Sequence, residues 1–234
     1  MTETIHLRPS APVAERVLLP GDPGRALRLA QLLVETPAQM LNHHRGLWGY
    51  TGVARDGALL TIQSTGMGGP SAAIVVEELI ALGAQQLLRV GTCGALVPDL
   101  SLGDLLIAER VMPADGVSRL LGADPFLLPD AHLLAKLESA ATESPARRAT
   151  IVSADLFYDP DPSRPSGWME QGAVAVEMEA AAILAVAARH GIAAGCALVV
   201  SDELAGATRR RISTEALHAA EERLGRLAAS ALGA

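Results

Sequence analysis

Two arginines stand where a strand or a helix meets a glycine-rich turn, a setting that suits an anion. Arg25 follows the turn at 21–24 at the start of a predicted helix, where free N–H groups and the helix dipole attract negative charge. Arg89 lies inside a predicted apolar strand before the turn at 91–94, and its burial without a partner would be costly. Each arginine alone is more often part of a structural ion pair. Together they predict a phosphate site, to which Thr92 can add a hydroxyl donor.

Acidic residues follow two later strands. Glu177 and Glu179 are expected to open a helix, where one acid is enough to complement the dipole. The other, facing the end of the sheet, would suit the vicinal hydroxyls of a sugar, because a carboxylate accepts hydrogen bonds from both. Asp202 ends an apolar strand, and we expect it either to cap the segment that follows or to act as a general acid.

The segment at 66–71 (GMGGPS) is a weak match to a dinucleotide-binding loop. Ser71 stands at the third glycine position and Pro70 precedes it, so the segment does not predict a dinucleotide cofactor. Two interpretations stay open: the glycines let the backbone approach a ligand closely, or they only make a tight turn from strand to helix.

Alternating strands and helices must position these residues. Strands are predicted at 17–19, 59–64, 87–90, 105–111, 150–152, 174–176 and 195–200, and helices at 25–34, at 71–82 and along an alanine-rich run ending at Gly191. This order predicts one α/β domain over 1–234, with three αβα layers around a mixed, twisted sheet. The polar clusters follow the strand ends, where such sheets bind ligands.

Two segments between the predicted elements are polar or rich in proline. Residues 142–148 are expected to form a polar connector. Residues 159–166 are expected to form a proline-rich surface loop that could act as a lid. Neither reads as an inter-domain linker.

Composition limits the class of protein. Half of the 234 residues are hydrophobic and 19% are charged, which indicates a compact fold rather than a disordered chain. A net charge of −7 and 3% aromatic residues argue against a nucleic-acid partner. Cys93 and Cys196 have no metal-ligand spacing and fit a reduced compartment. No leader and no long apolar run is recognised, so we expect a cytoplasmic protein without a membrane partner.

Seven motifs in order resemble the nucleoside phosphorylase family, and most closely its bacterial hexameric purine nucleoside phosphorylases. They are GDPGRA (21–26), HHRGLWGYTG (43–52), STGMGGPSAAIVVEEL (64–79), RVGTCGAL (89–96), SADLFY (153–158), VEMEAAA (176–182) and VVSDEL (199–204). The resemblance implies phosphorolysis of purine (deoxy)ribonucleosides to free base and (deoxy)ribose 1-phosphate, in purine salvage. It implies phosphate as a co-substrate, no cofactor or metal, and a homo-oligomer, a hexamer built as a trimer of dimers.

The resemblance also implies residue roles. Phosphate would be held by Gly21, Arg25, Arg89 and Thr92, with Arg45 reaching in from a neighbouring subunit. Ribose would be held by Met67, Met178, Glu179 and a neighbour's His6, the last at the 5′-hydroxyl. The base would be lined by Cys93, Gly94, Phe157, Val176 and Glu177. Asp202 would be the general acid at purine N7, assisted by an arginine from 209–211, of which we select Arg210.

Absent family features narrow the substrate. Uridine phosphorylases of this family carry a Gln-x-Arg pair that the loop at 159–164 lacks, so purines are favoured. The related methylthioadenosine nucleosidases lack the set of phosphate-binding arginines, which favours phosphorolysis. Some relatives with asparagine at the position of Asp202 prefer 6-oxopurines, so we expect adenosine to be accepted with inosine and guanosine. The alternatives are a uridine phosphorylase, a nucleoside hydrolase and a non-catalytic nucleoside-binding protein.

Overall fold

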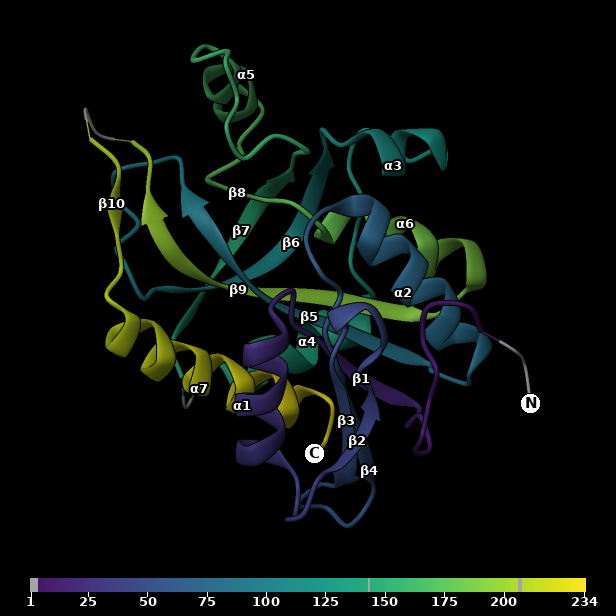
Figure 1. The fold of residues 1–234 in the computed structure, drawn as a ribbon. Helices are drawn as coiled ribbons and strands as arrows, with labels where there is room; N and C mark the ends of the chain where they lie inside the picture. Colours follow the sequence, from purple (N-terminus) through teal and green to yellow (C-terminus); the bar gives the residue numbers. More distant parts are fainter. Residues whose placement is uncertain (1–3, 143, 206–207) are drawn as a thin grey trace.

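A mixed β-sheet crosses the centre of the computed structural model, which describes residues 4–142, 144–205 and 208–234 (Figure 1). The strands are β1 (Arg16–Leu19), β2 (Gln39–Asn42), β3 (Gly49–Val53), β4 (Leu59–Gln63), β5 (Gln86–Ala95), β6 (Leu105–Pro113), β7 (Ala146–Ser153), β8 (Ala175–Glu177), β9 (Ala193–Glu203) and β10 (Arg210–Arg211). The helices are α1 (Pro23–Leu33), α2 (Gly69–Ala81), α3 (Gly116–Leu120), α4 (Ala131–Ala140), α5 (Arg164–Glu170), α6 (Ala180–His190) and α7 (Thr214–Ala231), with a 3-10 turn at His44–Gly46.

The sheet closes on itself at one end. Its strand order is β10-β9-β6-β7-β8-β5-β1-β4-β3-β2, and β5 also pairs with β9. This second pairing joins β5, β9, β6, β7 and β8 into a ring. The β5–β9, β6–β7 and β7–β8 pairs are parallel, whereas β5–β8 and β6–β9 are antiparallel. The predicted mixed sheet is confirmed; the ring was not expected.

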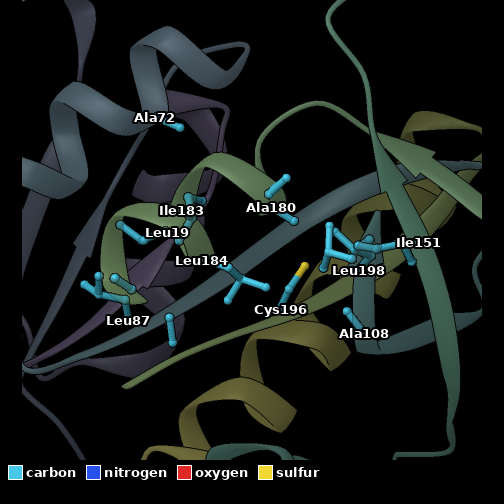
Figure 2. Packing of buried hydrophobic residues seen from close by; sticks show 14 of the residues in the cluster. Leu19, Ala72, Leu87, Ala108, Ile151, Ala180, Ile183, Leu184, Cys196 and Leu198 are labelled. Carbon is cyan, nitrogen blue, oxygen red and sulfur yellow. The ribbon is translucent and has the colours of Figure 1, made fainter. Parts of the chain in front are cut away.

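Helices cover both faces of the sheet, so the predicted three-layer α/β architecture is confirmed. α2, α3 and α6 pack together on one face, and α7 packs against α1 and α4 on the other (Figure 1). Figure 2 shows part of the first interface, where Ile183 and Leu184 of α6 lie in one buried cluster with Leu87 of β5 and Leu198 of β9. The small alanine side chains of α6 are buried along most of the helix, which lets it approach the sheet closely. As predicted, α6 ends at Gly191, which has a left-handed backbone.

Two predicted boundaries at the strand ends are wrong. The residues at 91–94 do not form a turn, because β5 continues through them, paired with β9 and bulged only between Cys93 and Gly94. The helix expected to open at Glu177 begins instead at Ala180, because β8 ends at Glu177 and Glu179 is the N-cap residue.

The two polar segments are shorter than predicted. Within the connector at 142–148, β7 begins at Ala146, where its pairing with β6 starts, and residue 143 lies outside the described residues. Within the loop at 159–166, α5 begins at Arg164, and Pro165 occupies one of its first positions, where proline favours a helix start. None of the helices in the described ranges is long and apolar enough to cross a membrane.

Candidate functional site

A cavity of about 520 Å³ opens at the carboxyl ends of the central strands. Its volume lies in the range of small-molecule sites. All of the residues expected at the site line it except His6, Arg45 and Arg210. The lining residues are Gly21, Asp22, Pro23, Arg25, Gly66, Met67, Arg89, Thr92, Cys93, Gly94, Ala154, Leu156, Phe157, Val176, Glu177, Met178, Glu179, Ser201, Asp202, Leu204, Arg209 and Arg211.

Arg89 is a buried cation at the floor of this cavity, with 3% of its surface exposed. Its Nε donates to Glu177 at 2.7 Å, and its Nη2 pairs with Glu179. Burial alone would lower the pKa of Arg89, but the carboxylates of Glu179 and Glu177 raise it above its ordinary value, so the charge is permanent. Nη1 is buried without a hydrogen-bond partner among the described residues. A buried donor of this kind requires an acceptor, which an anion in the cavity can supply.

Glu177 borders the cavity, but protein donors occupy its carboxylate. Besides Arg89, it accepts hydrogen bonds from the N–H groups of Glu179 and Ala180, each at 2.9 Å to Oε2, and from the hydroxyl of Ser153. Its side chain therefore holds Arg89 in place rather than facing a ligand. Ser153, which also accepts from the N–H of Ala181 at 2.9 Å, is a supporting residue that the sequence analysis missed.

Glu179 connects the glycine-rich segment after β4 to the floor of the cavity. Its Oε1 accepts the N–H of Gly68 at 2.6 Å, and Gly68 has a left-handed φ of 84° that favours glycine. Burial raises the pKa of Glu179 despite the opposing charge of Arg89. Met67 and Met178 line the cavity beside it. The segment at 66–71 thus makes the turn into α2 and also donates a backbone hydrogen bond to a site residue.

Arg25 borders the cavity from the start of α1. Asp22 caps this helix by accepting the N–H of Arg25 at 2.7 Å. The Nε of Arg25 donates at 2.7 Å to Glu221, a buried residue of α7, whose other oxygen accepts from Arg28 at 2.6 Å. Neither Glu221 nor the helix that carries it was predicted from the sequence. The apolar spacing of residues 217, 224, 227 and 228 is typical of such a helix but does not indicate the partner of Glu221.

Asp202 lies near the carboxyl end of β9, where it pairs with Gly94 of β5. Its carboxylate accepts from the Ser201 hydroxyl at 2.8 Å and from Arg209 Nε at 3.0 Å. Arg209 in turn lies over the ring of Phe157, with its Cζ 4.4 Å from the centroid. Five residue steps, or about 16 Å of backbone, lead from Arg89 to Gly94 along β5. The arginine and the acid therefore line different parts of the cavity.

The expectation that Arg210 accompanies Asp202 is wrong. Residues 210 and 211 form β10, in which Arg210 pairs with Glu203 and Arg211 with Asp202. Because successive strand side chains point to opposite faces, Arg210 turns away from the cavity and its Nη1 lies 2.9 Å from Glu203. Arg209 makes the contact with Asp202 instead, and Arg211 Nε lies 4.0 Å from the same carboxylate.

His6 and Arg45 do not line the cavity, and His6 contacts His44, the residue before Arg45. The Nδ1 of His6 is 2.7 Å from Glu78 Oε1, and its carbonyl oxygen is 3.0 Å from His44 Nδ1. Arg45 follows His44 and has a φ of 58°, the one positive φ among the described residues that is not at a glycine. Such backbone strain in an arginine is typical of functional positions.

Cys93 lines the cavity, and its thiol is 3.6 Å from the carbonyl oxygen of Val199. Burial raises the pKa of the Cys93 thiol well above its ordinary range. Cys93 is therefore an uncharged wall residue, not a nucleophile. The described residues hold no cluster of His, Cys, Asp and Glu that could bind a metal ion.

The cavity therefore has buried arginines at one end and a hydrogen-bonded carboxyl group at the other. Such an arrangement can hold an anion at one end and donate a proton to a leaving group from the other.

Comparison with known proteins identifies the family of this chain. The family model described as the phosphorylase superfamily matches residues 15–233, and the chain belongs to that superfamily. A purine nucleoside phosphorylase of the DeoD type from Geobacillus kaustophilus (strain HTA426) is 39% identical over 197 residues, 82% of this chain and 82% of that protein. Another of this type, from Jannaschia sp. (strain CCS1), is 40% identical over 210 residues, 86% and 88% of the two chains. A guanosine phosphorylase from Halorubrum lacusprofundi is 36% identical over 201 residues, 85% and 82%. The family expected from the motifs is confirmed.

Proposed function

We propose that this protein cleaves purine ribonucleosides and deoxyribonucleosides with inorganic phosphate, releasing the free base and (deoxy)ribose 1-phosphate. The observation that carries the proposal is the buried Arg89, which borders the same cavity as Asp202 and whose Nη1 has no hydrogen-bond partner in the described part of the chain. The relatives named purine nucleoside phosphorylase support the same reaction.

In this proposal phosphate binds at the cationic end, between Arg89 and Arg25. The backbone at Gly21 and the hydroxyl of Thr92 line the same part of the cavity and supply neutral donors. As the bond from C1′ to the purine nitrogen breaks, the sugar acquires oxocarbenium character, and the phosphate anion stabilises that charge before its oxygen bonds to C1′. The fixed arginines orient this anion without having to reorganise during the reaction.

The purine leaves toward Asp202. Asp202 first takes up a proton from solvent. The electron pair of the broken bond then moves into the base, and this proton passes from Asp202 to N7 and neutralises the base. Ser201 and Arg209 hold the carboxyl group in position, so we propose both as supporting residues for the acid. A carboxyl group at N7 can serve both 6-amino and 6-oxo purines, so the proposed substrates are adenosine, inosine and guanosine.

Between these ends the nucleoside is held by its sugar hydroxyls and its base. We propose that the Glu179 carboxylate also accepts hydrogen bonds from the ribose hydroxyls. Met67 and Met178 would pack on the sugar. The base is proposed to lie among apolar and backbone groups at the mouth of the cavity. These are Cys93, Gly94, Phe157 and Val176.

The proposed enzyme is a homo-oligomer, a hexamer by its resemblance, with sites shared between subunits. His6 and Arg45 support this proposal because neither lines its own chain's cavity and Arg45 has a strained backbone. They would complete a neighbour's site, at the ribose 5′-hydroxyl and at phosphate. We propose no cofactor or metal, phosphate being a co-substrate. We place the enzyme in the cytoplasm, which fits its two free, buried cysteines.

The reaction is tested by incubating the purified protein with inosine, adenosine or uridine, each with and without phosphate, and identifying both products. We expect base release from the two purine nucleosides only with phosphate, and ribose 1-phosphate as the sugar product. Free ribose formed without phosphate would make the protein a hydrolase. Turnover of uridine alone would make it a uridine phosphorylase, and binding without turnover would make it a binding protein.

Shared sites are tested by mixing inactive subunits. With adenosine as the substrate, the Arg45→Ala and Asp202→Asn variants are each expected to be nearly inactive. Mixed oligomers contain sites in which Asp202 of one subunit meets Arg45 of the other, so mixing after partial dissociation is expected to restore part of the activity. No recovery in oligomers shown to be mixed would contradict the sharing of sites.

A further inference from the structure

A second, smaller cavity of about 230 Å³ lies between α1 and α7. Arg25 borders both cavities, so this residue separates the proposed phosphate site from the outer surface of the two helices. The residue facing Arg25 from α7 is Glu221, which is 3% exposed. The proposed reaction assigns no role to this carboxylate, and burial of a charged group is costly unless it is paired.

Glu221 makes one contact with each of two arginines. Its Oε1 accepts from Arg25 Nε at 2.7 Å, and its Oε2 accepts from Arg28 Nη2 at 2.6 Å. A guanidinium group has its donors in one plane, so holding the Nε edge fixes the direction of the two terminal nitrogens. Within the described residues those terminal nitrogens of Arg25 make no hydrogen bond, and they remain free for an anion.

The packing of the two helices fixes Glu221 itself. Gly225 lies one turn further along α7 on the same face, directly against Leu29 of α1. A Cβ atom at Gly225 would lie 2.4 Å from Leu29 Cδ2, so the absence of a side chain at Gly225 lets the two helices pack closely at this point. This packing keeps Glu221, one turn earlier on the same face, beside Arg25.

The charges explain why an acid so close to the proposed phosphate site does not repel phosphate. Arg28, which is more exposed than Arg25, neutralises Glu221 from the outer side. Arg28 also lies 3.8 Å from Asp22, so each of the two carboxylates near Arg25 is paired with an arginine. The terminal nitrogens of Arg25 are held by neither carboxylate and are left to face the anion.

We propose that Glu221 is a positioning residue for phosphate: it holds the Nε edge of Arg25 so that the terminal nitrogens face the phosphate site. This inference rests on the proposed phosphorolysis. Glu221 acts only through Arg25, so its removal weakens phosphate binding and leaves nucleoside binding unchanged.

The test compares Glu221→Gln with Glu222→Gln, which removes the same charge one residue along α7, at an exposed position bordering the same outer cavity. In Glu221→Gln the KM for phosphate is expected to rise about tenfold, since small misplacements of a binding group have effects of that size. The KM for inosine is expected to stay within about twofold of the wild type. Glu222→Gln is expected to behave as the wild type. Glu221→Asp, which keeps the charge, is expected to give a smaller rise and serves as the test if Glu221→Gln does not fold.

A double-mutant cycle separates positioning from a structural role. In an Arg25→Gln background, Glu221→Gln is expected to add no further rise in the KM for phosphate. Equal effects of Glu221→Gln in both backgrounds, an unchanged or lower KM for phosphate, or a loss of thermal stability alone would overturn the inference. Wild-type protein that releases no base with phosphate would instead overturn the proposed function, so the two failures are distinguishable.

Discussion

Adding one methyl group at Gly91 is expected to displace the Arg89 guanidinium from the floor of the cavity. A Cβ atom there would lie 2.7 Å from Nη2, 2.8 Å from Cζ and 3.1 Å from Nη1 of Arg89. The backbone at Gly91 does not have a positive φ, so alanine fits the strand and the strain falls on the arginine. The guanidinium group must move by a large part of an ångström, which breaks or stretches its contacts with Glu177 and Glu179.

The cost of Gly91→Ala follows from those contacts. Overpacking a filled core costs about 1–3 kcal/mol, and a hydrogen bond to a charged group contributes about 1.5–3 kcal/mol. Loss of one carboxylate contact therefore predicts a decrease of about 3 kcal/mol in the free energy of unfolding, or about 6–12 °C in Tm. Because Arg89 also leaves the proposed phosphate position, kcat/KM for phosphate is expected to fall about a hundredfold.

Thermal unfolding and phosphate-dependent base release measure the two effects separately. The matched control is Gly167→Ala in α5, where an added Cβ meets nothing within 4 Å. It is expected to leave base release with phosphate unchanged and to raise Tm slightly, because alanine favours a helix over glycine. If Gly91→Ala kept the wild-type Tm and the wild-type KM for phosphate, Arg89 would not be confined as described, and the argument from its buried contacts would fail.

Three further predictions concern single groups. Asp202→Asn is expected to lower adenosine turnover about 10²–10⁴-fold, the usual contribution of a general acid, and inosine turnover less; equal losses would contradict the assigned role. Cys93 is expected to resist iodoacetamide at pH 8 in the folded protein and to react after unfolding, because burial raises its pKa; mass spectrometry detects the adduct, and rapid labelling of the folded protein would contradict its burial. Burial alone would raise the pKa of Glu78, but hydrogen bonds from Leu7 and His6 hold it below its ordinary value, so its contribution to stability is present above about pH 4 and lost as the pH falls through the lowered pKa. Glu78→Gln is therefore expected to be less stable than the wild type at pH 7 and to approach it below pH 4 in denaturant titrations, and a constant difference across that range would refute the linkage.

The types of the side chains predicted which residues line the two ends of the cavity. The course of the backbone around these residues was predicted less well. An arginine in an apolar strand and an acid at a strand end indicate a functional site even where the predicted bounds of the strands are wrong. Gly91 and Gly94 led to a wrong prediction of a turn. Glycine is typical of turns, but it is also typical of places where a neighbouring side chain needs room. Here Gly91 makes room for Arg89, and a Cβ atom at Gly94 would lie 2.6 Å from Leu204 Cδ1. Only the pairing of β5 with β9 distinguishes the two uses.

The supporting residues could not be predicted from the sequence because their partners are distant along the chain. Ser153 meets Glu177 across two strands, and Glu221 meets Arg25 from the far end of the chain. The choice between Arg209 and Arg210 depended on the register of β10, a strand of two residues that has no periodicity of its own. A shift of one residue in that register exchanges which arginine faces Asp202.

The ring of five strands also determines when the site comes into existence during synthesis. The residues proposed for phosphate lie on β5 or before it in the chain and the proposed acid lies on β9, so the whole length of β6, β7 and β8 is made between them. A nascent chain that has reached β8 therefore has the proposed phosphate-binding arginines but lacks the acid. The edge of β5 that pairs with β9 in the complete protein has no partner at that stage. Such non-local pairing forms slowly, and an open strand edge invites association with other chains. Truncated chains that end before β9 are thus expected to be inactive and prone to aggregate, and ribosomal pausing within β6 to β8 would prolong that exposure.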